Sequence, residues 1–190
     1  MIATGYLAKR IVQRPDWLKA PEVHDIYSVS GCTSGEFMAY IEFWRHNGFW
    51  LFDSPEIIQA LGRENNVNMD GLTYFYYEVY EKEFDEEPKE WMPFGSAPFP
   101  TNVMPPVKKE LHGFDVVTFS QRTNPECSPL SCNHLASEIP TNTHCLLESF
   151  EEAKQNLELG KFDHSEPGPF RIFAVYTIDP NYWSDSSSHV

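Results

Sequence analysis

The densest group of reactive side chains in the sequence lies between Cys127 and Cys145. The segment from Cys127 to His134 holds two cysteines, two serines and a histidine, and a second histidine follows at position 144. A cysteine thiolate is a strong nucleophile, and a histidine within hydrogen-bond reach can act as its base. The pattern therefore indicates Cys132 as a candidate nucleophile, with His134 or His144 as its base.

The local sequence gives this catalytic hypothesis limited support. If a short helix begins near Leu130, Cys132 lies in its first turn, where the helix N–H groups favour a thiolate. However, the segment lacks a Gly-x-Ser-x-Gly elbow and the familiar sequence contexts of cysteine proteases. We therefore treat the protein as more consistent with a non-enzyme, and thiol-dependent catalysis stays as the alternative.

The same segment contains the side-chain types that bind zinc. The candidate ligands are Cys127, Cys132, His134, His144 and Cys145. Their spacing is poor for one ion, because neighbouring residues of a strand point to opposite faces and His144 is adjacent to Cys145. The sequence also has no glycine-rich phosphate-binding loop. We expect no metal and no cofactor, and buried free thiols explain the cysteines best, with a structural zinc site as the second alternative.

Composition narrows the function classes. The chain has 190 residues, 41% of them hydrophobic, and a formal net charge of −14. This charge repels phosphate backbones, which argues against nucleic-acid binding. No segment approaches the roughly 20 apolar residues needed to cross a bilayer, and no signal-peptide pattern is visible. We expect a cytoplasmic protein that binds neither nucleic acid nor membrane, and the sequence does not define its oligomeric state.

Residues 85–112 combine acidic, proline and aromatic side chains. Four of its first six residues are acids, and the segment contains six prolines. A free linker would rarely carry so much apolar surface, so we expect it to pack on the fold as a connector. Acidic and aromatic groups together suit a basic protein partner. The predicted binding residues are Asp85, Glu86, Glu87, Trp91, Phe94 and Phe99.

A weak internal repeat organises the rest of the chain. Residues 50–56 align with residues 145–151, and both read as a short apolar strand, an acid and a serine. Ser54 and Ser149 suit helix N-caps, and Gly62 and Gly160 suit helix ends. Strand-like runs follow at residues 74–80 and 170–176. Upstream, residues 25–29 resemble residues 115–119.

The two halves differ between the repeated elements. Residues 33–47 have the apolar spacing of an amphipathic helix. Residues 121–143 are polar and proline-rich instead, with at most a short helix around residues 130–137. Because functional residues are common on irregular segments held by a rigid frame, this difference indicates a site in the second half.

These patterns predict an α/β or α+β fold, a single compact body built from two similar strand–helix–strand units. We expect an N-terminal unit at residues 1–84, the connector at residues 85–112, a C-terminal unit at residues 113–183 and a disordered tail at residues 184–190. The preferred function is a non-catalytic acidic binding protein of the inhibitor, immunity or regulatory type.

Overall fold

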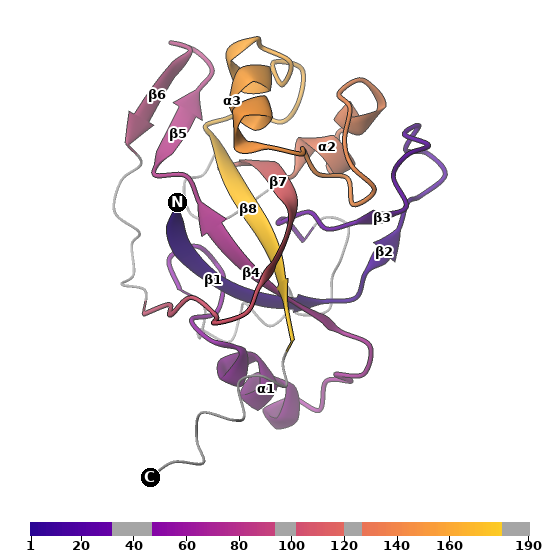
Figure 1. Cartoon of the computed structure of the whole chain (residues 1–190), viewed down its shortest axis with the longest axis vertical. Helices are drawn as coiled ribbons and strands as arrows, with labels where there is room; N and C mark the ends of the chain where they lie inside the picture. The colour runs from indigo at the N-terminus through magenta and orange to yellow at the C-terminus, as the bar shows by residue number, and fades with distance from the viewer. Residues whose placement is uncertain (32–46, 94–101, 120–126, 180–190) are drawn as a thin grey trace.

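The architecture is organised around an antiparallel sheet of six strands (Figure 1). The computed structural model describes residues 1–31, 47–93, 102–119 and 127–179. The sheet strands are β1 (Ile2–Lys9), β4 (Thr73–Val79), β5 (Lys82–Asp85), β6 (Glu90–Pro93), β7 (Glu110–Thr118) and β8 (Phe170–Ile178). Their order is β1-β4-β8-β5-β6, and β7 pairs with the other edge of β8. Two short strands, β2 (Val12–Gln13) and β3 (Asp25–Ile26), pair with each other beside the sheet.

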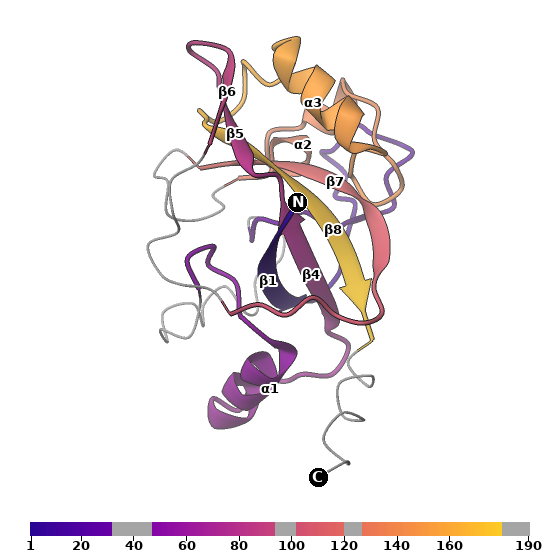
Figure 2. The same cartoon turned by 60° about the vertical axis from the view of Figure 1, so that its left-hand side comes forward.

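Two helices lie at opposite ends of the sheet, as Figure 2 shows. Helix α1 (Pro55–Glu64) packs against β1, and α3 (Phe150–Glu158) packs against β7 and β8. Between β7 and α3 lie the four-residue helix α2 (Pro129–Cys132) and the 3-10 turn η2 (Leu135–Ser137). The fold is therefore mixed, strand-dominated and compact, within the predicted class. In the described residues, no helix is long and apolar enough to cross a membrane.

The ends of the two main helices follow the local sequence closely. Ser149 caps α3, since its hydroxyl accepts a hydrogen bond from the backbone N–H of Glu152 at 3.1 Å. Gly160 follows α3 with φ of +72°, a left-handed conformation that glycine adopts without strain. Gly62, in contrast, lies inside α1, where the Met69 side chain packs against it.

Each of these helices is preceded by a turn built on an asparagine, and the two turns have the same hydrogen-bond pattern. Nδ2 of Asn47 donates to the carbonyl of Thr4 at 2.7 Å, and Nδ2 of Asn142 donates to the carbonyl of His112 at 2.6 Å. Each Oδ1 accepts from the backbone N–H groups two and four residues later, at 2.9 and 3.4 Å in the first turn and 2.9 and 3.1 Å in the second. Each asparagine therefore joins a helix-entry turn to one edge strand of the sheet.

A glycine in each edge strand makes this close approach possible. Gly5 and Gly113 have φ of +140° and +142°, and the register of β1 and β7 shifts beside them. A Cβ atom on Gly5 would lie 2.7 Å from the carbonyl oxygen of Phe52, and one on Gly113 would lie 2.7 Å from that of Leu147. Both positions exclude any other residue without a backbone shift.

These contacts relate β1 to β7, which differs from the sequence alignment. That alignment matched residues 25–29 with residues 115–119, yet Asp25 and Ile26 form β3 outside the main sheet. The ladders also pair Gly5 with Tyr77 and Gly113 with Val175, so β4 and β8 correspond in a register shifted from the predicted one. Alternating apolar residues are common to most half-buried strands, which is why this pattern alone matched two strands that the structure places in different sheets.

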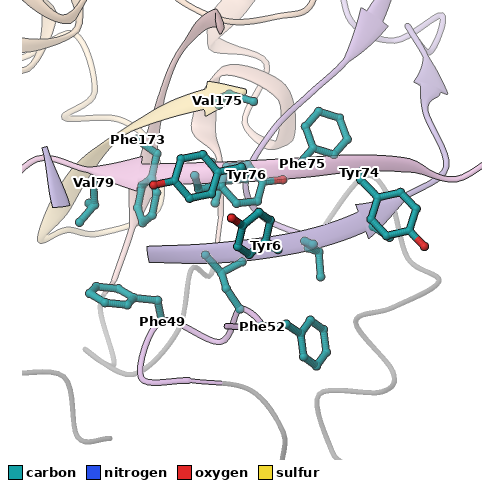
Figure 3. Close-up of a cluster of buried hydrophobic side chains, with 14 of the residues drawn as sticks. Tyr6, Phe49, Phe52, Tyr74, Phe75, Tyr76, Val79, Phe173 and Val175 are labelled. Carbon is teal, nitrogen blue, oxygen red and sulfur yellow. The ribbon is translucent and has the colours of Figure 1, made fainter. Parts of the chain in front are cut away.

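The core is formed by two adjoining clusters of buried side chains. The first lies around β1, β4 and α1, and Figure 3 shows its aromatic residues. In it the rings of Tyr6 and Tyr76 lie 5.0 Å apart between centroids. The second cluster lies around β7, β8, α2 and α3. Full burial of such side chains contributes about 1.5–3 kcal/mol each to folding.

The predicted connector contains regular structure. The boundary at residue 84 falls inside β5, and β5 and β6 form a hairpin that projects from the sheet (Figure 1). We call residues 82–93 the acidic hairpin. The connector boundary at residue 112 falls inside β7. Of the predicted helix at residues 33–47, all but the last residue lie outside the described residues, as does the tail at residues 184–190.

Replacing either edge-strand glycine by alanine is expected to destabilise the fold by more than about 2 kcal/mol, because the new Cβ meets a backbone carbonyl. Gly71→Ala is the matched control. Gly71 also has a positive φ, of +73°, but its nearest neighbour would be the Arg10 guanidinium at 3.4 Å, so we expect a cost of about 1 kcal/mol. Urea unfolding measures all three variants, and equal losses would contradict the steric argument.

Candidate functional site

Cys132 lies at the end of α2, against the segment that follows β3. Its Sγ is 3.7 Å from the Ser30 hydroxyl and 3.9 Å from the Ser131 hydroxyl, and the side chain is half-buried. The short helix begins at Pro129, close to the predicted start, and Cys132 lies at the end of its single turn, with its backbone N–H donating to the carbonyl of Ser128 at 2.9 Å.

A buried lysine fixes the segment that carries Ser30. Lys9 is 4% exposed, and its ammonium donates to the carbonyls of Ser28 at 2.5 Å, Val29 at 2.9 Å and Ser30 at 3.4 Å. The ammonium also lies 5.8 Å and 5.7 Å from the ring centroids of Phe75 and Tyr77. A buried ammonium loses its hydration water, and here carbonyl dipoles and aromatic faces take the place of that water.

A buried aspartate holds the same segment through its N–H groups. Oδ2 of Asp115 accepts from the backbone N–H of Val29 at 2.7 Å and from the Ser128 hydroxyl at 2.6 Å. The Ser128 oxygen in turn accepts from the N–H of Ser30 at 3.2 Å. The segment is thus fixed from both sides, by Lys9 on its carbonyls and by Asp115 and Ser128 on its amides.

Asp115 is also the most perturbed carboxyl of this cluster. Burial is the main cause that raises its pKa to about 7, and its two hydrogen bonds oppose that rise. Its Oδ1 and the hydroxyl of Tyr77 are both fully buried without a hydrogen-bond partner. A charged group whose protonation changes near neutral pH, next to a half-buried thiol, is a functional-site candidate.

The two candidate histidines have their own partners. His134 is exposed, and its ring packs edge-on against Trp17 at 4.6 Å between centroids. Nδ1 of His144 lies 2.6 Å from Oδ1 of Asp25, and the His144 ring stacks on Tyr27 at 4.1 Å. The structure thus brings Cys132 together with Ser30 and Ser131, and the histidines with residues of the β2–β3 region.

The other cysteines in this region are buried. Cys127, Cys132 and Cys145 are free thiols, and burial is the main cause that raises the pKa of Cys145 far above its usual value. The Cys127 thiol donates to Oδ1 of Asn133 at 3.3 Å. Within the described ranges, no group of three cysteine, histidine or acidic side chains could hold a metal ion.

The predicted binding residues that the structure describes lie together on the acidic hairpin. Asp85 ends β5, Glu86 and Glu87 form the turn, and Trp91 lies in β6. The Trp91 indole donates to Glu158 of α3 at 2.8 Å and packs against Tyr80 at 5.5 Å between centroids. The hairpin is thereby docked on α3. Phe94 and Phe99 lie outside the described residues.

An apolar hollow of about 330 Å³ opens beside this hairpin. We call it the apolar hollow; it is lined by Met1, Tyr80, Phe114, Phe150, Ala174 and Tyr176. The hollow adjoins the hairpin through Tyr80, which contacts both Phe150 at 4.8 Å and Trp91. Sequence reasoning missed it, because its lining comes from five separate parts of the chain.

The origin of the hollow follows from the two matched ladders. Tyr6 pairs with Tyr76 one residue after Gly5, and Phe114 pairs with Ala174 one residue after Gly113. Ala174 therefore has the same ladder position relative to Gly113 that Tyr76 has relative to Gly5. The Tyr76 ring fills its site against Tyr6, whereas the methyl group of Ala174 leaves space beside Phe114.

The surface around the apolar hollow is rich in acids. Residues 82–93 contain five acids and two lysines, but Glu83 is buried and paired with Arg171 at 2.9 Å, which leaves four acids for the surface. Glu81 and Glu151 are exposed next to the hollow residues Tyr80 and Phe150. Lys89 is paired with Asp163 at 3.0 Å, and Lys154 lies 3.7 Å from Glu158. Both lysine charges are thus partly neutralised by neighbouring carboxylates, and the surface around the hollow stays negative.

Comparison with known proteins gives no relative: no family model, no curated protein and no solved structure matches the chain. The function must therefore be argued from the site alone.

The raised pKa of Asp115 predicts a specific pH dependence of stability. Because the folded-state pKa, about 7, lies above the ordinary value of 3.8, Asp115 costs stability as pH rises through this interval. Urea unfolding measures the unfolding free energy of the wild type and of Asp115→Asn at pH values across this interval. From the low to the high end, we expect the wild type to lose on the order of 3 kcal/mol of stability relative to Asp115→Asn. Parallel profiles would show that Asp115 ionises normally in the fold.

Proposed function

We propose that the acidic hairpin and the apolar hollow form a non-catalytic binding surface that captures a basic protein partner. The observation that supports this most is the juxtaposition of an open aromatic-lined hollow with a docked acidic hairpin. The partner chemistry that fits is an apolar or aromatic side chain flanked by lysine or arginine.

The two parts of this surface have different roles. The hollow buries the apolar side chain of the partner, which contributes about 1.5–3 kcal/mol. The acids attract the basic flanks and increase the association rate, and salt screens this attraction over a Debye length of about 10 Å at 0.1 M ionic strength. An excess of 28 acids over 14 bases in the whole chain extends the attraction beyond the hairpin.

We infer further that the two units descend from one ancestral unit by duplication. The matched asparagine turns, the two bulge glycines and the corresponding ladder registers support this inference. On this view, the first unit preserves a filled core at Tyr76, and the second opened the hollow when a small residue came to occupy position 174.

Filling the apolar hollow tests the proposed function directly. Ala174→Phe places a ring where the first unit holds Tyr76, so the fold has a precedent for the change, whereas Ala174→Ser keeps the hollow open. The probe is a fluorescein-labelled lysine-rich peptide with one central leucine, measured by fluorescence anisotropy. We expect Ala174→Phe to weaken binding at least about tenfold, which is the loss of one buried leucine, and Ala174→Ser to bind like the wild type.

Two comparisons decide the outcome. The same peptide with serine in place of leucine should bind weakly to the wild type and be insensitive to Ala174→Phe. Binding of the leucine peptide should weaken from low to physiological ionic strength. Equal binding of the leucine and serine peptides, or no salt dependence, would contradict the proposal, provided that thermal unfolding shows both variants to be folded.

Thiol-dependent chemistry at Cys132 is the second candidate function. The observation behind it is the buried Asp115, whose Oδ1 lacks a hydrogen-bond partner, so that the carboxylate can serve as a base for the Cys132 thiol. The interaction with Cys132 raises the pKa of Asp115, because the two negative charges repel each other. The free thiols of all the described cysteines also support the expectation of a reducing, cytoplasmic location.

Alkylation with iodoacetamide tests this candidate. Among the three described cysteines, Cys132 is half-buried and Cys127 and Cys145 are buried, so we expect Cys132 to be modified before those two. An activated thiol should react faster at neutral pH than free cysteine, and Asp115→Asn should change that rate. Peptide mapping assigns the modified residue. A Cys132 rate at or below that of free cysteine, unchanged in Asp115→Asn, would exclude an activated thiol.

A further inference from the structure

The second unit carries a cluster of polar side chains that reach solvent. At the corresponding positions, the first unit has buried side chains. The asparagine turns and the ladders relate Thr4 to His112, Phe49 to His144 and Val79 to Thr177. Thr4 and Val79 are fully buried and Phe49 is 5% exposed, and Figure 3 shows Phe49 and Val79 in the apolar cluster. Their three counterparts are half-buried and reach solvent.

The polar side chains of this cluster contact one another in a row. Nε2 of His112 lies 2.7 Å from the hydroxyl of Thr177. The rings of His112 and His144 meet edge-on at 5.1 Å between centroids, and Nδ1 of His144 lies 2.6 Å from Asp25. Tyr27 stacks on His144 and meets His112 edge-on at 5.1 Å, which fixes the orientation of both imidazoles.

Thr177 also lines a second hollow, of about 390 Å³. We call it the Thr177 hollow; its other lining residues are Lys108, Lys109, Glu110, Ile178 and Asp179. Two lysines and two acids give walls of both signs, which suit an uncharged or zwitterionic molecule better than a strongly charged one. The ammonium of Lys109 is bound to Glu78, so its charge is already partly neutralised.

We propose that Thr177 and His112 form a nucleophile–base pair that accepts an acyl group from a small uncharged ester in the Thr177 hollow. A hydroxyl and an imidazole nitrogen at 2.7 Å have the geometry that nucleophilic catalysis requires. The inference does not rest on the binding function proposed above, because the apolar hollow has none of these lining residues.

The protonation of His112 suits this role. Burial, followed by the neighbouring His144, lowers the pKa of His112 below its ordinary value of 6.5, and Glu110 and Asp25 oppose this effect. His112 is therefore neutral at neutral pH, and a neutral imidazole can accept the proton of a hydroxyl.

The reaction balances in two steps. As Oγ1 of Thr177 attacks the ester carbonyl carbon, its proton passes to Nε2 of His112; the bond between that carbon and the leaving alkoxide breaks, and the alkoxide takes the proton from His112. Water then attacks the acyl-threonine with its proton passing to His112, which returns it to Oγ1 of Thr177. The net change is hydrolysis of one ester to an acid and an alcohol.

The probe for the test is p-nitrophenyl acetate, an uncharged ester whose product is coloured. The full chain is incubated with it, p-nitrophenolate release is followed by absorbance, and mass spectrometry of the digested protein locates any acetyl group. We expect an acetyl group on Thr177. Thr177→Val and His112→Thr, which introduce the residues of the first unit, should lose the adduct and slow release about 100-fold.

Conservative variants separate chemistry from folding. Thr177→Ser keeps a hydroxyl and should keep the adduct, now on the serine, whereas Thr177→Val keeps the branched Cβ without the hydroxyl and should lose it. An acetyl group found only on other residues, or release rates in Thr177→Val and His112→Thr equal to that of the wild type, would overturn the proposal.

Discussion

The contact between an asparagine turn and a glycine bulge is the constraint on which the rest of the structure depends. At Gly5 and Gly113 the chain of a helix-entry turn approaches the edge strand so closely that a Cβ atom would lie 2.7 Å from a carbonyl oxygen. The asparagine side chain satisfies the polar groups that this approach would otherwise leave buried and unpaired. The contact sets where each helix starts relative to the sheet, and thereby the position of every side chain that lines a hollow.

Given this common frame, the differences between the units become informative. Leu7 and Asp115 follow their bulge glycines at the same distance and pair with Phe75 and Phe173. A leucine contributes to stability there, whereas a fully buried aspartate with a raised pKa costs it. A fold tolerates such a cost when the group has a structural or chemical task, and Asp115 has at least the first, since it fixes the amides of the segment that holds Ser30 beside Cys132.

Local signals in the sequence predicted local structure well and the site poorly. The serine at position 149, the left-handed Gly160 and the strand-rich runs within β4 and β8 depend on residues close together in the chain. The match of β1 with β7 depends on glycines with different spacing to the rest of each unit, so a fixed-offset comparison could not find it. Burial of Asp115 and the space beside Ala174 arise from contacts between distant segments. A signal was present in one case: asparagine occurs at the same distance before the aligned serines, at positions 47 and 142.

The distribution of polar groups also explains why the predicted cysteine–histidine centre divides into separate parts. His144 and Cys145 are neighbours in the chain, but the backbone turns at Cys145, where φ is 62° and left-handed. Cys145 enters the core, while His144 faces Asp25 and Tyr27. The corresponding turn in the first unit has the same φ sign at Trp50 and places Phe49 in the core. The backbone of this turn therefore accommodates either an apolar or a polar side chain two residues after its asparagine, buried in the case of Phe49 and half-buried in the case of His144.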